Sequence, residues 1–210
     1  MKKCKNCSSK FNPKFFNQKY CLKDECIKVI TNEALENNKK AKQKAWNNRK
    51  AESKKTLKLG AKKEALQTSI NKIARMIDGY FNYGCIDCGN KVIGTGHGAH
   101  KNNVGSYENL RFNLHNIHKS RVHCNKYSSE HKVGYSKGLK ERYGEDYCKY
   151  VEDEINVKYK YLGLRYEDLS DALKVSNRII KDFDSICSEN VFKDGKEFRN
   201  FLNKKIGIYV

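Results

Sequence analysis

The first twenty-six residues contain two closely spaced pairs of cysteines, and this pattern restricts the fold of the chain more than any other. Cys4 and Cys7 are separated by two residues, and Cys21 and Cys26 by four. Two such pairs joined by a loop supply the four soft ligands that tetrahedral zinc requires. A segment this short buries too little surface to fold alone, so bound metal would supply the folding energy. The spacing predicts a structural zinc site; unpaired thiols are the alternative.

The charge of the chain indicates a polyanionic partner. Its 210 residues include 43 Lys and Arg but only 24 Asp and Glu, which gives a net charge of +19. Nucleic acid is the simplest partner for such an excess. Binding to an anionic membrane would need a basic amphipathic helix with bulky apolar residues, or a lipid anchor. We expect DNA as the partner and no membrane.

The N-terminal sequence and the apolar runs indicate a cytoplasmic protein. The opening MKKCKNCSSK lacks the apolar stretch of a signal peptide. No run is long and apolar enough to span a bilayer. In a reducing cytoplasm the nine cysteines are expected to be metal ligands and free thiols rather than disulfides.

A lysine-rich segment follows the cysteine module. Residues 27–59 contain neither Gly nor Pro, and their apolar residues are too sparse for a core face. They predict an exposed helix or a partly disordered arm, which Gly60 is expected to end. The segment 61–81 has apolar residues at spacings of three and four, which predicts an amphipathic helix. These residues are Leu66, Ile70, Ile73, Ile77 and Phe81.

The basic residues of this segment are the expected phosphate contacts, because ammonium and guanidinium groups neutralise the DNA backbone. The lysines of the cysteine module make it a second candidate for contacting DNA. The predicted DNA-binding residues are Lys39, Lys40, Lys42, Lys44, Arg49, Lys50, Lys54 and Lys55.

A second set of potential ligands lies in residues 82–134, which hold all six histidines. Helical periodicity is weak before about residue 116, so strands and loops are expected there, followed by a short helix from about residue 117. Cys85 and Cys88 form another close pair. The other residues of interest follow in the order His97, His100, Asn116, His118, Cys124 and Asn125.

This order suits a ββα-metal nuclease. In such a centre a histidine at a strand end acts as general base on a water molecule, and one divalent ion stabilises the charge that develops on the leaving oxygen. An amide side chain fixes the second ring nitrogen of the base. Cysteines on either side, bound to zinc, would clamp the hairpin to the helix.

The expected fold is α+β and mostly helical. Residues 1–27 form a small N-terminal zinc module, and 28–81 a long basic helical arm. Residues 82–150 form the ββα-metal (HNH) nuclease core, and 151–210 a C-terminal helical region. The final IGIYV predicts a strand or a packed end.

Several motifs resemble those of the NinG/Rap family of lambdoid phages, HNH-type endonucleases that cut branched recombination DNA. The resemblance covers about residues 1–180. It implies a metal-dependent endonuclease in the host cytoplasm, acting on Holliday junctions, D-loops or flaps with Mg²⁺ or Mn²⁺. The motifs are CIDCG at 85–89, HGAH at 97–100, LRF at 110–112, NIHKSRVHCN at 116–125 and YSKGLKERYG at 135–144.

The resemblance also implies roles for single residues. His100 would be the general base, and Asn116 would orient it or cap a helix. His97 and Asn125 would hold the catalytic ion, and His118 would assist catalysis, bind zinc or lie in the core. The spacing also resembles that of the junction-resolving endonuclease VII of T-even phages, where an Asn directly after the last zinc cysteine binds the catalytic metal.

Two residues depart from the family pattern. His97 replaces an Asp, and this softer ligand shifts the metal preference from Mg²⁺ toward Mn²⁺, Zn²⁺ or Ni²⁺. Arg121 replaces the third zinc cysteine and cannot bind metal. The second zinc, on Cys85, Cys88 and Cys124, therefore takes His118 or His123 as its fourth ligand, or is absent. Asp87 is a weaker alternative, and His115 and His131 are expected at the surface.

Two other functions remain open at this stage. One is a zinc-containing protein that binds nucleic acid without cutting it, and the other is an HNH nuclease that requires a defined sequence. Nicking that depends on a divalent ion separates the first from the nuclease. A homodimer is also open, because a junction has two strands to cut.

Overall fold

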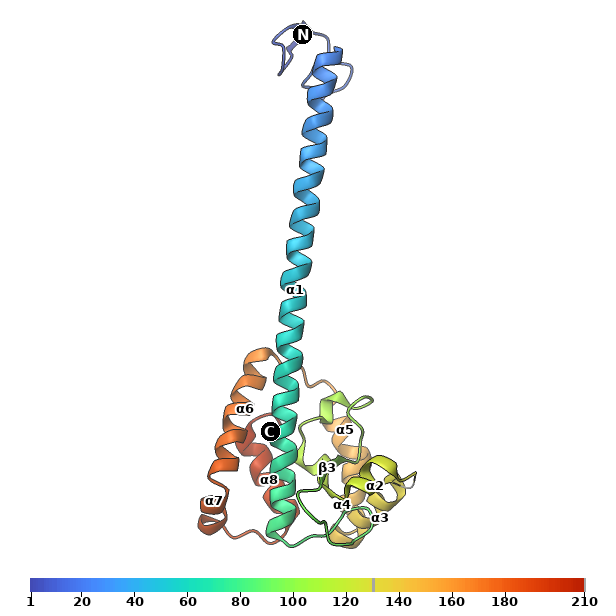
Figure 1. Ribbon diagram of the computed structural model, residues 1–210, viewed down its shortest axis with the longest axis vertical. Coiled ribbons are helices and arrows are strands. Elements are labelled where there is room, and N and C mark those ends of the chain that lie inside the picture. Colours follow the sequence, from blue (N-terminus) through green and yellow to red (C-terminus); the bar gives the residue numbers. More distant parts are fainter. Residues whose placement is uncertain (130, 210) are drawn as a thin grey trace. The chain divides into compact units, whose positions relative to one another are not determined.

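The computed structural model describes residues 1–129 and 131–209, except for the side chain of Lys55 (Figure 1). It is mostly helical, with two small antiparallel sheets, as predicted for the fold class. The chain forms two compact units, Met1–Lys58 and Leu59–Val210. In chain order the elements are β1 (Lys2–Lys3), β2 (Lys10–Phe11), α1 (Asp24–Tyr80), β3 (His97–His100), β4 (Ile117–Ser120), α2 (Val122–Tyr127), α3 (His131–Tyr143), α4 (Glu145–Lys149), α5 (Ile155–Lys158), α6 (Tyr166–Lys181), α7 (Phe183–Glu189) and α8 (Gly195–Ile206). Single 3-10 turns lie at Glu108–Leu110 and Leu114–Asn116, and a π-helical turn at Tyr150–Glu154.

Helix α1 runs without interruption through Gly60, so the prediction that this glycine ends the helix is wrong. A glycine inside an exposed helix costs only about 1 kcal/mol relative to alanine. The residues around it, LKLGAKKEAL, are strong helix formers and outweigh that cost. Asp24 and Glu25 lie in the first turn, where negative charge stabilises the positive end of the helix dipole.

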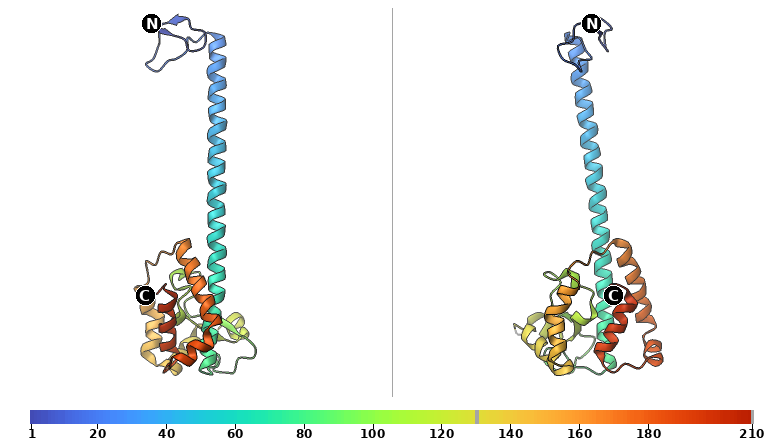
Figure 2. Two further views of the ribbon diagram at one scale, coloured as in Figure 1. Left: turned by 90° about the vertical axis from the view of Figure 1, so that its left-hand side faces the viewer. Right: turned by 180° about the vertical axis from the view of Figure 1, so that it is seen from behind.

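The last part of α1 forms the centre of the larger unit, as its apolar periodicity predicts. Its side chains Leu66, Ile70, Ile73 and Ile77 are fully buried and pack against α6 and α8. Figure 2 shows α6, α7 and α8 on one side of this part of α1, with the β3–β4 hairpin and the shorter helices on the other. The amphipathic helix therefore contacts both halves of the unit.

A second apolar cluster lies beneath the hairpin. Tyr135 and Leu139 of α3, together with Ala99 of β3, are buried there. Two glycines let α3 approach the loop that carries the second cysteine pair. A Cβ on Gly138 would lie 1.7 Å from the carbonyl oxygen of Ile86, and a Cβ on Gly134 would lie 2.7 Å from that of Asp87.

The helix expected from about residue 117 begins at Val122, and residues 117–120 form strand β4 instead. The reason for the error is that β4 is covered on both faces. Ile117, His118 and Ser120 are all buried, so the alternation that marks a half-exposed strand is missing. Among the described residues, no helix has the length and apolar character needed to cross a membrane.

Candidate metal centres and active site

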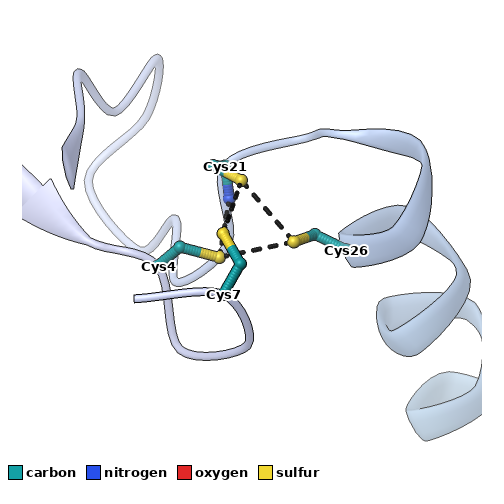
Figure 3. Close-up of side chains that lie close together, drawn as sticks. All are labelled: Cys4, Cys7, Cys21 and Cys26. Carbon is teal, nitrogen blue, oxygen red and sulfur yellow. Dashed lines mark hydrogen bonds between the residues drawn. The ribbon is translucent and has the colours of Figure 1, made fainter. Parts of the chain in front are cut away.

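The N-terminal cysteine group consists of Cys4, Cys7, Cys21 and Cys26, whose sulfur atoms point toward one another (Figure 3). The Sγ atoms of Cys4 and Cys26 are 3.6 Å apart, and that of Cys21 lies 3.5 Å from both Cys7 and Cys26. Four sulfurs at about 2.3 Å from a tetrahedral zinc ion lie about 3.8 Å from each other. The arrangement therefore fits the predicted zinc ligands closely, with no ligand position to spare.

Backbone groups near these thiols favour the thiolate form that binds metal. Burial raises the pKa of the Cys4 thiol, but N–H groups of Cys7, Asn6 and Cys21 outweigh it and lower that pKa to about 6. At Cys26, a hydrogen bond from Asn6 lowers the pKa, whereas burial and the neighbouring thiols raise it to about 12. One thiol thus ionises easily while another resists, because four negative charges cannot gather here without a cation.

Replacing Cys7 by Ser is expected to release the zinc of this module and to unfold residues 1–26. A hydroxyl is a poor substitute for a thiolate ligand, and the local apolar cluster, built around Cys4, Tyr20 and Cys26, is too small to fold the segment without metal. Metal analysis and limited proteolysis would measure both effects, and residues 59–209 should remain resistant. Freshly purified, unchelated wild-type protein without zinc would contradict the prediction.

The second cysteine group consists of Cys85, Cys88 and Cys124, whose sulfurs lie within 4.8 Å of one another. Cys85 and Cys88 belong to the loop after α1, and Cys124 to the first turns of α2; the Sγ atoms of Cys88 and Cys124 are 3.6 Å apart. The backbone N–H of Arg121 donates to the Cys85 sulfur at 3.2 Å. Three thiols therefore meet as predicted, with Arg121 at the place of the missing ligand.

Neither histidine proposed as the fourth ligand belongs to this group. His118 is fully buried, and its Nδ1 lies 2.9 Å from the hydroxyl oxygen of Tyr135. His123 is exposed, with its ring beside that of Tyr127. Among the described residues, Asp87 comes nearest, with Oδ2 3.5 Å from the Cys85 sulfur.

The Asp87 carboxylate is already engaged by other groups. Its Oδ1 lies 2.5 Å from Nδ1 of His131, and its Oδ2 accepts a hydrogen bond from Ser120 at 2.5 Å. Burial raises the pKa of Asp87, but His131 and Ser120 outweigh it and hold this pKa below its ordinary value. Asp87 therefore ties the cysteine loop to β4 and α3. His131 is accordingly half-buried beside this carboxylate, whereas the sequence predicts it at the surface.

Changing Arg121 to Cys is expected to increase the zinc content of the protein or its melting temperature. Residues 121 and 124 have the spacing of a zinc-binding pair, and position 121 already contacts the Cys85 sulfur through its backbone. Metal analysis and thermal unfolding would test this result. An unchanged zinc content with lower stability would show that Arg121 has a role of its own.

Strands β3 and β4 pair antiparallel, with His97 opposite Ser120 and His100 opposite Ile117. Helix α2 begins two residues after β4 and lies against β3. The hairpin and the helix thus form a ββα arrangement. Its identity as an HNH nuclease core remains a prediction.

The two predicted ligands of the catalytic ion come together in this arrangement. Nδ2 of Asn125, from α2, lies 3.0 Å from Nδ1 of His97, from β3. Rotating the amide by 180° would place its oxygen at the same position. An imidazole nitrogen and an amide oxygen, both accepted ligands of divalent cations, therefore converge between a strand and a helix.

His100 lies on the other face of β3, because neighbouring side chains alternate along a strand. Gly98 on that face lies against Asn71 of α1, since a Cβ there would be 2.9 Å from the Asn71 Cβ. Nε2 of His100 lies 2.9 Å from Nε2 of Gln67 and 3.2 Å from Oδ1 of Asn71. The predicted base is thus held by α1 rather than placed beside His97.

Arg111 determines, through Gln67, which ring nitrogen of His100 carries the proton. Nε of Arg111 donates to Oε1 of Gln67 at 2.5 Å, which leaves the Gln67 amide N–H to donate to Nε2 of His100. The ring then carries its proton on Nδ1, a buried atom without a hydrogen-bond partner among the described residues. Burial, assisted by Arg111, lowers the pKa of His100 to about 4. His100 is therefore neutral at pH 7, but its lone pair is engaged.

Asn116 does not contact His100, which contradicts its predicted role as the residue that orients the base. Its side chain accepts from the N–H of Asn102 at 2.8 Å and donates to the carbonyl of Asn102 at 2.9 Å. Asn116 thus fixes the loop after β3. Gln67 holds the His100 ring in its place, and Asn71 lies beside it. Sequence patterns do not point to these two residues, because they lie on the polar face of an amphipathic helix.

Two other histidines are core residues. His118, predicted to be catalytic, is enclosed by Tyr135 and Tyr143, and burial holds its pKa well below the ordinary value. It cannot reach a substrate without a rearrangement of the core. His115, expected at the surface, is buried with Nδ1 2.8 Å from the Tyr147 hydroxyl.

A buried ion pair between α1 and α8 supports β4. The Asp78 carboxylate accepts from Arg199 at 2.6 Å and from the backbone N–H of Lys119 at 2.5 Å. Arg199 also donates to the carbonyls of Leu114 and Ile117 at 3.1 and 3.4 Å. Burial lowers the pKa of Arg199, but the Asp78 carboxylate outweighs it and raises that pKa. The sequence gives no sign of this pair, because its members are 121 residues apart.

The predicted DNA-binding residues are exposed, apart from Lys55, whose side chain lies outside the described residues. They lie on α1 within the first unit, with few acidic neighbours.

Replacing Lys39, Lys40, Lys42 and Lys44 by Gln should flatten the salt dependence of DNA binding, because each lost phosphate contact releases about one counterion fewer. The slope of log K against log salt should become less negative by up to about 3–4.

The matched control changes four exposed lysines of the other unit, Lys149, Lys160, Lys174 and Lys181, to Gln. It removes the same charge and should leave the slope nearly unchanged. Equal slopes for both quadruple variants would place the DNA path elsewhere.

Comparison with known proteins gives consistent matches. A family model described as Bacteriophage Lambda NinG protein matches residues 1–185. Protein ninG of Escherichia phage 933W is 31% identical over 170 residues, which cover 74% of this chain and 82% of the phage protein. Protein ninG of Enterobacteria phage H19B is 28% identical over 203 residues (90% and 96%), and that of Escherichia phage lambda is 30% identical over 172 residues (74% and 81%). No solved structure matches.

Proposed function

Because the chain belongs to the NinG family of bacteriophage proteins, we propose that it is a metal-dependent endonuclease that cuts branched DNA during phage recombination. The observation that carries the proposal is the convergence of His97 and Asn125 between β3 and α2. The family resemblance of the surrounding motifs supports it. The net charge of +19 suits a DNA substrate.

In the proposed centre, His97 and Asn125 would hold the divalent ion, His97 through its ring nitrogen and Asn125 through its amide oxygen. Such an ion would stabilise the negative charge that develops on the leaving oxygen of a phosphodiester. Arg121 and Lys126 are exposed on or beside α2 and are suited to bind the flanking phosphates.

His100 can take a proton from the attacking water only after its lone pair leaves Gln67. In the proposal, bound DNA draws Arg111 toward a phosphate, and Gln67 then loses the partner that fixes its orientation. The ring can then adopt the tautomer with a proton on Nε2, donated to Oδ1 of Asn71, and a free lone pair on Nδ1. Because Nδ1 is buried in the unbound protein, the same movement must also expose this atom to the attacking water. His97 is the alternative base if this change does not occur.

Cleavage of a Holliday junction, a flap and a linear duplex, with Mg²⁺ and Mn²⁺ in parallel, tests the proposal. We expect both branched substrates to be cut and the duplex to be spared, with Mn²⁺ at least as effective as Mg²⁺ because His97 replaces a carboxylate. Cleavage of the duplex at one defined sequence would indicate a sequence-specific nuclease. The mass of the protein–junction complex would show whether two copies bind.

A second function is favoured by the hydrogen bond that occupies the lone pair of His100. If this contact persists with DNA bound and His97 does not act as the base instead, the protein is a zinc-containing nucleic-acid-binding protein without nuclease activity. Binding to junctions with no nicking under either metal ion would identify this function.

A further inference from the structure

The N-terminal module has an open hollow with an exposed aromatic ring at its side. Its lining includes Phe16 and four lysines, Lys2, Lys3, Lys5 and Lys19. The hollow is separate from the N-terminal cysteine group and from the residues proposed to cut DNA. Aromatic and ammonium groups therefore meet here in a place that the proposed cleavage chemistry does not require.

Every charged side chain in residues 1–23, the segment that forms the hollow, is positive. Residues 1–23 contain seven lysines and neither Asp nor Glu. Asp24 and Glu25, between the last two zinc cysteines, contribute −2, and four thiolates around one divalent zinc carry −4 + 2 = −2, so a net charge of about +3 remains on residues 1–26. A ligand for the hollow is therefore expected to be an anion.

Two neighbouring phenylalanines are unusually exposed for so small a module. Phe16 is 90% exposed and Phe15 is 60% exposed, whereas Phe11 packs against the apolar cluster around Cys4 and Cys26. The fold thus uses one phenylalanine for its core and presents the other two to solvent. Exposed aromatic rings beside cations can stack on flat ligands.

The loop that carries Phe16 is fixed rather than free. The Lys2 ammonium donates to the Phe16 carbonyl at 2.6 Å and lies 5.6 Å from the centre of its ring. Gln18 is buried, accepts from the N–H of Lys14 at 2.7 Å and donates to the carbonyl of Tyr20 at 2.8 Å. A loop whose backbone is held in this way loses little conformational entropy when a ligand binds to Phe16.

We infer that this hollow binds single-stranded nucleic acid, with an unpaired base stacked on Phe16 and the adjoining phosphates held by Lys2, Lys3, Lys5 and Lys19. An exposed aromatic ring on a fixed loop beside a row of cations is the combination that binds single strands, because every unpaired base offers a flat face. In a duplex both faces of each base are covered by its neighbours, so Phe16 has nothing to stack on.

The inference adds to the proposed function and rests on it only for the choice of DNA over RNA. In a branched DNA, the module would hold the unpaired nucleotides of a flap or displaced strand. The cleavage centre is formed by other residues, so binding at the hollow can be measured without cleavage.

The test measures binding of the full-length protein to fluorescent oligothymidylate and to a duplex of equal length, without added divalent ions or chelator. Phe16→Ala should weaken binding to the single strand by about five- to one-hundred-fold, the typical effect of losing one stacked base. Binding to the duplex should change little. Phe16→Trp should restore single-strand binding, and all variants should retain the zinc of the wild type.

A matched charge control separates the hollow from its surroundings. Lys5→Gln should weaken single-strand binding more than Lys10→Gln, since Lys10 is exposed on β2 of the same module but does not line the hollow. Equal weakening of single-strand and duplex binding by Phe16→Ala, or no weakening with zinc retained, would overturn the inference. Much tighter binding of oligouridylate than of oligothymidylate would overturn DNA as the ligand.

The outcomes also separate this inference from the proposed function. A protein that binds single strands through Phe16 but cuts no DNA supports the inference and refutes the nuclease. The opposite result is a protein that cuts junctions but whose Phe16→Ala variant binds single strands normally. It would support the nuclease and refute the inference.

Discussion

Replacing His97 by Ala is expected to reduce cleavage of a branched DNA at least about ten- to one-hundred-fold at low Mn²⁺, with partial recovery at high Mn²⁺. Loss of one of two protein ligands weakens the binding of the ion, and a higher concentration compensates by mass action. Asn125→Ala should behave in the same way, because its side chain meets His97 at 3.0 Å. Initial cleavage rates measured across a metal titration would show both effects.

His100→Ala provides the comparison. If His100 is the base, its loss should reduce the rate by about one-hundred- to ten-thousand-fold at every metal concentration, while DNA binding and zinc content persist. His123→Ala, on the exposed side of α2, is the control and should cut normally. If His97→Ala were inactive at every metal concentration and His100→Ala were active, His97 would be the base instead of His100. Normal cleavage by both variants would place the active site elsewhere.

Replacing Arg199 by Leu should destabilise the larger unit by about 3–5 kcal/mol, because the Asp78 carboxylate would remain buried without its main partner. Arg142, 3.5 Å from Asp78, compensates only in part. The carbonyls of Leu114 and Ile117 would also lose their donor. Urea unfolding, followed through the near-ultraviolet circular dichroism of the buried tyrosines, would measure the change.

Two further variants identify the cause of that loss. Asp78→Asn combined with Arg199→Leu should be less destabilised than Arg199→Leu alone, since no unpaired charge remains. Arg165→Leu removes the exposed ion pair with Asp168 and should leave the free energy of unfolding nearly unchanged, because solvent screens this pair. If Arg199→Leu and Arg165→Leu were equally mild, the buried pair would not hold α8 to α1.

Sequence reasoning succeeded where a local pattern has a direct physical cause. The spacing of Leu66, Ile70 and Ile73 predicted the buried face of α1, because an apolar stripe must be covered. The close cysteine pairs predicted two groups of thiols, because the short spacing alone brings the members of each pair together. It failed at Gly60, where a known helix breaker is outweighed by its neighbours, and at β4, where burial on both faces hides the strand period.

The candidate site was predictable only in part. The resemblance to the NinG/Rap family and to endonuclease VII implied that His97 and Asn125 share an ion, and the structure brings the two side chains together. The partners of His100 were missed because Gln67 and Asn71 are distant in sequence and look like ordinary surface residues of a helix. Asn116 and His118 were assigned to chemistry by residue type. Burial gives them structural roles instead, in a loop and in the core.

Helix α8 and the residues after it impose an order on assembly during synthesis. Arg199, Asn203 and Tyr209 bond to the segment that leads into β4, through the backbones of Leu114, Phe112 and Asn109. A ribosome releases these residues after the hairpin, whereas the cysteine module emerges before it. The nascent chain therefore gains its metal-binding module long before the hairpin has its final support. A product truncated before residue 195 would retain the N-terminal module and the basic helix proposed to bind DNA. It would lack the support that α8 gives to the hairpin of the proposed cleavage centre.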